Sequence, residues 1–173
     1  FNNEDTISKI VLTSILRELG PVLAGLMVAG RVGAKMAAEI ATMRVSNQID
    51  ALETLATRPI QYLIAPRLIA AILCVPFLVL IGNIIGVFGG FVVAVFKLDF
   101  NASIYIVSTF EHVKYLDILQ GMVKALIFGI IITIISCFFG FHALGGAEGV
   151  GRATTTAVVT SSVLILTSTY FIT

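Results

Sequence analysis

The chain has 173 residues, of which 58% are hydrophobic and only 12% are charged, and its formal net charge is +1. Soluble domains carry about 25% charged residues, so this composition excludes an ordinary soluble domain and predicts an integral membrane protein. The nearly neutral charge also excludes a strongly basic surface of the kind that binds nucleic acid.

The first predicted element is a membrane-spanning helix over about residues 7–33, and a pair of charges interrupts it. Arg17 and Glu18 stand side by side, and Gly20 and Pro21 follow them directly. A charge at bilayer depth costs about 2.5–3.5 kcal/mol, so it persists where it faces a bundle interior, a partner or a watery cavity. Neighbours on a helix do not face each other, so each charge needs its own partner. We expect a polar site on a turn bent by Pro21; the alternative is a structural Arg and Glu that each pair with another helix.

A polar connection over residues 34–67 is expected next, and its middle has the pattern of a short amphipathic helix. Ser46 is a candidate N-cap for a helix over residues 47–56. Its apolar and acidic residues recur on different faces; they are Ile49, Leu52, Asp50 and Glu53. Membrane-surface helices carry Lys or Arg on the polar face, so two acids without a base favour a protein partner. Glu39 and Arg44 are expected on an extension of the first helix beyond the membrane.

Three more spanning helices are predicted, over about residues 68–96, 118–141 and 157–173, because a spanning helix needs about 20 mostly apolar residues. Pro76 predicts a kink in the second of them. Lys124 lies in the third, about two turns from its outer end. It either snorkels to the interface or contacts a lipid headgroup.

The distribution of Lys and Arg predicts the orientation of these spans. Six of these residues belong to the connection 34–67 with its flanks and to the glycine-rich loop 140–156; they are Arg31, Lys35, Arg44, Arg58, Arg67 and Arg152. Three belong to the other side, namely Lys9, Lys97 and Lys114. Both connections are therefore expected in the cytoplasm, with residues 1–6 and 97–117 outside.

Small residues at spacing four form two rows, in which helix backbones can approach closely. One row is Gly25, Ala29 and Gly33, and the other is Gly82, Gly86 and Gly90. Each row fits either packing within the chain or a seam between two copies. Cys74 and Cys137 lie in apolar stretches and are expected to be small buried hydrophobes.

The sequence contains no catalytic, metal-binding or cofactor-binding pattern. His112 and His142 are the only histidines and belong to loops on opposite sides. The phosphate-binding loop Gly-x-x-x-x-Gly-Lys-Ser/Thr is absent, so the chain is not expected to hydrolyse ATP or to act as an enzyme.

Several motifs together carry a resemblance that covers essentially the whole chain. They are Leu16-Arg17-Glu18-Leu19-Gly20-Pro21-Val22, Ala29-Gly30-Arg31-Val32-Gly33-Ala34, Ala38-Glu39-Ile40, Met43-Arg44, Gln48-Ile49-Asp50-Ala51-Leu52, Pro66-Arg67 and Gly151-Arg152-Ala153-Thr154-Thr155. With these motifs the chain resembles the MlaE (YrbE-type) permease family, the membrane subunits of ABC transporters that work with MCE-domain proteins on lipids.

The resemblance implies a fold and a set of partners. The fold is an all-α, polytopic helical bundle with four spanning helices and a short cytoplasmic coupling helix, forming one permease domain over residues 1–173. The family has an N-terminal interfacial helix and one more spanning helix before this region, which predicts that the sequence is a fragment. The implied partners are an ABC ATPase, a periplasmic MCE-domain protein, a second copy of the chain and phospholipid, without nucleic acid. The implied location is the bacterial inner membrane or the equivalent organelle membrane.

The resemblance also implies roles for particular residues. The lipid-binding set is Arg17, Glu18 and Lys124, with apolar walls from Leu16, Leu19, Val22 and Leu23. The set that couples to the ATPase is Glu39, Arg44, Ile49, Asp50, Leu52 and Glu53, and Arg152 matches a family Arg in the last cytoplasmic loop. Two other functions remain open: a secondary transporter of an amphipathic substrate, and a membrane scaffold that transports nothing.

Overall fold

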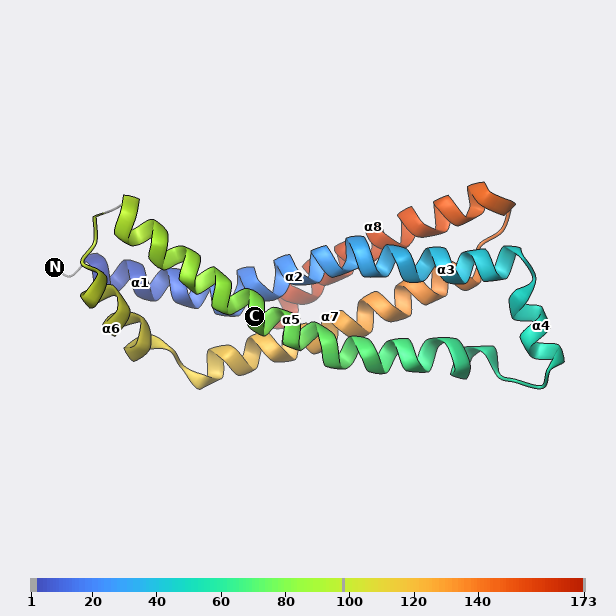
Figure 1. Ribbon diagram of the computed structural model, residues 1–173, viewed down its shortest axis with the longest axis horizontal. Coiled ribbons are helices and arrows are strands. Elements are labelled where there is room, and N and C mark those ends of the chain that lie inside the picture. The colour runs from blue at the N-terminus through green and yellow to red at the C-terminus, as the bar shows by residue number, and fades with distance from the viewer. Residues whose placement is uncertain (1–2, 98, 173) are drawn as a thin grey trace.

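The computed structural model describes residues 3–97 and 99–172, and the regular structure in this part is helical, without a strand. Four helices are long and apolar enough to cross a membrane. They run along one axis of an elongated bundle, with α4 at one end and α6 at the other (Figure 1). The predicted all-α membrane protein is therefore confirmed. Phe1, Asn2 and Thr173, to which the predictions for the outward start and the last span extend, lie outside the described residues.

The first long helix is continuous over Thr6–Val45, although its hydrogen-bond pattern changes twice. It consists of α1 (Asn3–Ser14), the π-helical turn η1 (Ile15–Leu19), α2 (Gly20–Val28), a second π-helical turn η2 (Ala29–Gly33) and α3 (Ala34–Val45). The bend expected at Pro21 takes the form of η1, a type of bulge that often marks a functional site. At 1.5 Å per residue the 40 residues span about 60 Å, about twice the hydrocarbon thickness, so α3 extends beyond the bilayer as expected.

The chain turns between α3 and α4 without the N-cap that the sequence predicted for α4. Ser46 ends α3, and its hydroxyl donates to the Thr42 carbonyl at 2.8 Å. Asn47 precedes α4 (Gln48–Thr54) and adopts the left-handed conformation with φ 56°, which Asn tolerates better than most residues. The prediction of Ser46 as the N-cap is wrong, because its hydroxyl is already bonded one turn back.

The remaining helices are α5 (Pro59–Lys97), α6 (Ala102–His112), α7 (Tyr115–Phe141) and α8 (Gly146–Ile172). Three of them, α5, α7 and α8, are longer than the predicted spans, and α6 lies where a connection without a helix was expected. The expected glycine-rich loop 140–156 is mostly the first part of α8, and only Gly145 and Gly146 have positive φ. Gly149 lies inside the helix, where an added Cβ would overlap the Leu144 carbonyl. The glycines therefore serve a tight turn and a close approach, and the expectation of a loop that extends to residue 156 was wrong.

The first row of small residues packs within the chain. Ala29 is fully buried in a core with Val79 and Phe128, which joins the first long helix to α5 and α7. A Cβ on Gly25 would lie 3.0 Å from the Phe128 ring, and one on Gly33 would lie 3.0 Å from the Ser136 hydroxyl. This row is therefore not an open seam for a second copy.

The second row of small residues packs only partly within the chain, and only one of the two cysteines is buried. A Cβ on Gly86 or Gly90 would contact Ile15 or Val11 of the first long helix, whereas Gly82 faces open space. Cys137 is buried as predicted, but Cys74 is exposed. Sequence alone does not distinguish the lipid-facing side of an apolar helix from its buried side, because both are apolar.

Helix α6 packs against α1 at the end of the bundle opposite α4 (Figure 1). The Ser8 and Thr109 hydroxyls are 3.1 Å apart, and Ser8 is fully buried. Burial raises the pKa of the Tyr105 hydroxyl, and its hydrogen bond with Ser8 partly offsets that rise. The phenol therefore stays protonated at neutral pH and remains able to donate.

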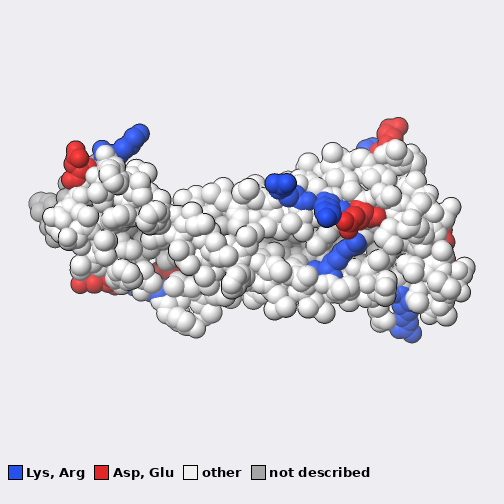
Figure 2. All heavy atoms as spheres, in the orientation of Figure 1, with Lys and Arg blue, Asp and Glu red and all other residues white. Residues whose placement is uncertain are grey.

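Charged side chains are unevenly distributed on the face of the bundle shown in Figure 2. On the face shown in Figure 2 they gather at the end formed by α1 and α6 and over the half that ends in α4, with an uncharged stretch between them. This distribution fits a protein that crosses a bilayer.

Candidate functional site

The candidate site is built on η1, where Pro21 removes a backbone donor. The Gly20 N–H bonds to the Ile15 carbonyl in the π-helical pattern. Pro21 has no N–H for the Arg17 carbonyl one turn back. That carbonyl instead accepts from Lys124 Nζ of α7 at 3.0 Å. A side chain from another helix thus satisfies the backbone group that the proline leaves open, as a membrane interior requires.

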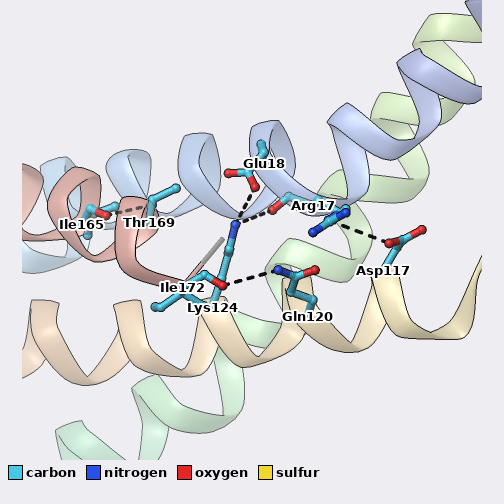
Figure 3. A network of polar contacts seen from close by, with 8 residues as sticks. All are labelled: Arg17, Glu18, Asp117, Gln120, Lys124, Ile165, Thr169 and Ile172. Carbon is cyan, nitrogen blue, oxygen red and sulfur yellow. Dashed lines mark hydrogen bonds and ion pairs between the residues drawn. The ribbon is translucent and has the colours of Figure 1, made fainter.

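Lys124 also forms an ion pair with Glu18. Its Nζ is 2.7 Å from Glu18 Oε1, and its side chain is fully buried, whereas the Glu18 side chain is 37% exposed (Figure 3). A charge-assisted bond this short is among the stronger interactions available to a side chain. The interpretation of Lys124 as a snorkelling residue is wrong, because its ammonium points into the bundle toward η1.

Arg17 pairs with a different residue of α7. Its Nε lies 3.8 Å from Asp117 Oδ1, and the two side chains are 35% and 14% exposed. The expectation that Arg17 and Glu18 each need their own partner is therefore confirmed. We call Arg17, Glu18, Asp117 and Lys124 the charged quartet. It contains two cations and two carboxylates (Figure 3).

Asp117 is the member of the quartet that sequence reasoning missed. Asp117, Gly121 and Lys124 are spaced i, i+4 and i+7, so they share one face of α7. That spacing was the available signal. Gln120 is nearby and donates from Nε2 to the Ile172 carbonyl at 3.4 Å, which brings the end of α8 close to the quartet.

Two glycines and an asparagine let three helices meet at η1. A Cβ on Gly121 would lie 2.7 Å from the Leu16 carbonyl, and one on Gly20 would overlap the Asn83 amide of α5. Asn83 is buried, and its Oδ1 has no hydrogen-bond partner among the described residues. The quartet thus lies at a close junction of the first long helix, α5 and α7.

The apolar residues expected to line the site point in different directions. Leu16 is buried, and Val22 packs against the core. Leu19 and Leu23 are exposed and line a groove of about 580 Å³ between the first long helix and α5. The charges therefore face α7, whereas the open apolar wall faces α5.

At the end of the bundle formed by α4, which the sequence predicts to be cytoplasmic, the apolar side of α4 is turned inward. Ile49 is 2% exposed and packs with Ile40 and Leu63, and Leu52 is half-buried against the same cluster. Asp50 accepts from Arg44 at 2.7 Å, which ties α4 to α3. The exposed residues of this segment include Glu53 and Leu55, the latter 72% exposed. Leu55 is a surface residue that the predicted coupling set did not contain.

The other predicted residues of this end lie apart from α4. Glu39 pairs with Arg67 at 2.9 Å and with Lys35 at 3.8 Å. Arg152 is exposed on α8, and its guanidinium has no ion pair with a described residue. No group of three His, Cys, Asp or Glu residues in the described chain is placed to hold a metal ion.

Comparison with known proteins adds evidence that does not depend on this geometry. The family model described as Permease MlaE matches residues 1–173. The chain is 60% identical, over its whole length, to a probable ABC transporter permease protein of Rickettsia prowazekii, of which it spans 67%. It is 44% identical over 167 residues to a probable ABC transporter permease protein of Synechocystis, covering 96% of this chain and 64% of that protein. It is 40% identical over 158 residues to the chloroplastic protein TRIGALACTOSYLDIACYLGLYCEROL 1 of Arabidopsis thaliana, covering 91% of this chain and 45% of that protein.

Proposed function

The chain belongs to the MlaE permease family, and from this premise we propose that it is the permease subunit of an ABC transporter that moves phospholipid. In this proposal a separate ATPase binds the cytoplasmic side and an MCE-domain protein binds the outer side. The membrane is the bacterial inner membrane or its organelle equivalent. The relatives named as ABC transporter permeases support the ATPase partner. The name of the Arabidopsis relative contains the name of a lipid, trigalactosyldiacylglycerol, which supports a lipid substrate.

One observation carries the assignment of the lipid site, namely the difference between the two cations of the quartet. Lys124 is fully buried and bonded at 2.7 Å, whereas Arg17 is 35% exposed and 3.8 Å from its carboxylate. Arg17 is therefore the cation that a ligand can reach at the smaller cost. A guanidinium holds a phosphate through a planar two-donor fork, so we assign the lipid phosphate to Arg17.

Lys124 and Glu18 then position this site. Their bond and the bond from Lys124 to the Arg17 carbonyl hold η1 against α7. The turn fixes the direction in which the Arg17 side chain leaves the helix. In this proposal the exposed Leu19 and Leu23 offer an apolar surface beside the phosphate site.

We propose that α4 transmits the motion of the ATPase. Its inward side is packed on α3 and α5 through Ile49 and Leu52, so a displacement of α4 reaches both long helices. The partner contacts are assigned to the exposed Glu53 and Leu55 and to the hollow of about 1090 Å³ next to α4. The proposal includes a second copy of the chain, and this part rests on the family resemblance. The row with Gly25 and Gly33 does not support it, because that row packs within the chain.

The test is to purify the full-length protein with its ATPase and to measure lipid transfer between vesicles with and without ATP. The proposal expects co-purification of the ATPase and transfer that requires hydrolysis. Transfer by the permease without the ATPase would instead indicate a secondary transporter. A stable complex that hydrolyses ATP and moves no lipid would indicate a scaffold.

A further inference from the structure

The apolar groove lined by Leu19 and Leu23 continues along the α5 side of the first long helix, on the other side of that helix from the contacts of the charged quartet with α7. Two hollows of about 580 Å³ and 340 Å³ adjoin there and share Val28, Val32 and Leu78. The walls of the larger hollow are almost entirely apolar, and its one charged lining residue is Arg31. We call these joined hollows the α5 groove.

The length of the α5 groove suits a lipid chain. Along the first long helix its lining extends from Leu19 to Val32, which is about 20 Å at 1.5 Å per residue. One leaflet of the hydrocarbon core is about 15 Å thick, half of about 30 Å. An acyl chain that enters beside Arg31 would therefore reach the midplane while remaining within the groove.

Arg31 is the basic residue that lines the α5 groove, and Lys35 and Arg67 lie on the same two helices toward its cytoplasmic end. Lys35 and Arg67 both pair with Glu39, so these two residues and Arg31 together have an excess of two positive charges over that one acid (three minus one). Arg31 is exposed and has no ion pair among the described residues, and Arg67 Nη1 is buried without a hydrogen-bond partner there. The same half of the bundle carries the cluster of Lys and Arg visible in Figure 2.

We infer that the α5 groove binds an anionic phospholipid of the cytoplasmic leaflet, with one acyl chain in the groove and the phosphate on Arg31. Charge complementarity selects this occupant, because a net positive mouth above an apolar channel matches an anionic headgroup above a chain. The site is separate from Arg17, whose side chain points to α7. The inference rests on the proposed function in one respect, because the far end of the groove includes Leu19 and Leu23 of the proposed transport site, whereas the phosphate position at Arg31 does not require transport.

Two glycines of α5 provide a matched pair of variants. An added Cβ meets nothing within 4 Å at either Gly82 or Gly89, so a side chain can start at both positions without displacing a neighbour. Gly82 lines the α5 groove and Gly89 does not. Gly82→Leu would thus occupy the groove, while Gly89→Leu controls for the loss of a glycine. Arg152→Gln, at an exposed position of α8 outside the groove, is the charge control for Arg31→Gln.

The experiment uses the full-length permease with its ATPase in phosphatidylcholine vesicles that contain photo-crosslinkable lipid. The probes are phosphatidylglycerol and phosphatidylcholine, each with a diazirine in the acyl chain, and mass spectrometry locates the labelled segments. We expect labelling of Leu19–Val32 and Leu78–Gly86 with a preference for phosphatidylglycerol. Arg31→Gln should lower the phosphatidylglycerol signal about fivefold, the effect of about one surface charge. Gly82→Leu should abolish the signal of both probes, and both controls should keep it.

Other results would overturn the inference. Equal labelling by both lipids, or unchanged labelling in Gly82→Leu, would exclude a built anionic-lipid site. Cross-links from the groove to a second copy or to another segment of the chain would show that protein fills it. A complex that transfers no lipid but keeps charge-dependent labelling would contradict the proposed function and leave this inference standing.

Discussion

Lys124 contacts the first long helix at two points, a carboxylate and a backbone carbonyl. It bonds Glu18 and the Arg17 carbonyl from one fully buried ammonium. The carbonyl lacks a helix donor because Pro21 follows one turn later. The charge of Lys124 and the position of Pro21 are therefore parts of the same local structure.

We predict that Lys124→Met destabilises the protein and that the loss depends on Glu18. A hydrogen bond to a charged group contributes about 1.5–3 kcal/mol, and the exposure of Glu18 places the pair near the lower value. A double-mutant cycle of Lys124→Met with Glu18→Gln, followed by thermal unfolding in detergent, should give a coupling energy of about 1–2 kcal/mol. Lys97→Met, at an exposed lysine that ends α5, is the control. Additive effects in the cycle would contradict the pairing.

The sequence predicted one part of the quartet and missed the other for a physical reason. Arg17 and Glu18 were identifiable because charges at membrane depth are costly. Asp117 was assigned to the outer loop next to the third span, so its charge looked solvated. The structure begins α7 at Tyr115, which places Asp117 inside a helix and opposite Arg17. A charged residue near the end of a span is solvated if it lies outside the helix and needs a partner if it lies inside. Hydropathy locates the end of a span only approximately.

At the scale of elements, the glycine contacts determine how closely helices approach near the site. Gly121 lies against the Leu16 carbonyl of η1, and this neighbour is backbone, which cannot move aside without shifting a helix. Gly89, by contrast, faces open space.

We predict opposite effects for alanine at these two glycines. Gly121→Ala should lower the free energy of unfolding by about 1–3 kcal/mol, because the new methyl forces α7 away from η1. Gly89→Ala should be neutral or stabilising by up to about 1 kcal/mol, the usual gain from replacing a glycine in a helix. Unfolding curves of both variants test this, and equal behaviour of the two would contradict the close contact at η1.

The second element with a distinct expectation is α4. We predict that Glu53→Lys combined with Leu55→Asp weakens co-purification of the ATPase about tenfold, equivalent to about 1.4 kcal/mol. Thermal stability should not change, because both residues are exposed. Glu148→Lys, an exposed acid on α8 at the same end, is the charge control. Ile49→Ala should instead lower stability by about 2–4 kcal/mol, since Ile49 is buried. Normal ATPase binding by the double variant would contradict the assignment of this surface.

Periodicity predicted α4, but not which of its sides is open. An amphipathic helix has one apolar side, and the pattern is the same whether that side meets a partner or its own chain. Here Ile49 and Leu52 face the chain. The helix α6 was missed because it is short and lies between charged segments. The start of α8 was missed because glycines, which usually indicate loops, there permit close packing.

At the scale of the whole molecule, the two ends of the bundle should lie on opposite sides of the membrane. The excess of Lys and Arg near α4 predicts that this end lies in the cytoplasm, and α6 is at the other end (Figure 1). In a variant with Cys74→Ala and Cys137→Ala, we predict that a cysteine at Glu53 reacts with an impermeant maleimide only from the cytoplasmic side. A cysteine at Glu111 should react only from the outer side. Labelling of both from one side would contradict the topology.

The central claim is that Arg17 binds the lipid phosphate, and its most direct test compares Arg17 with the carboxylate that it faces. If Arg17 serves only to pair with Asp117, then Asp117→Asn should impair the complex as much as Arg17→Gln does. If Arg17 binds phosphate, removing the competing carboxylate should preserve or increase transfer.

The measurement is ATP-dependent lipid transfer by the reconstituted complex, with thermal stability followed in parallel. We predict that Arg17→Gln lowers transfer about 10- to 150-fold, the value of one charged hydrogen-bonding contact. Arg17→Lys should be a poor substitute because it lacks the planar fork, and Asp117→Asn should transfer lipid at least as well as the unmodified protein. Normal transfer by Arg17→Gln, or equal losses in Arg17→Gln and Asp117→Asn that follow a loss of stability, would contradict the claim.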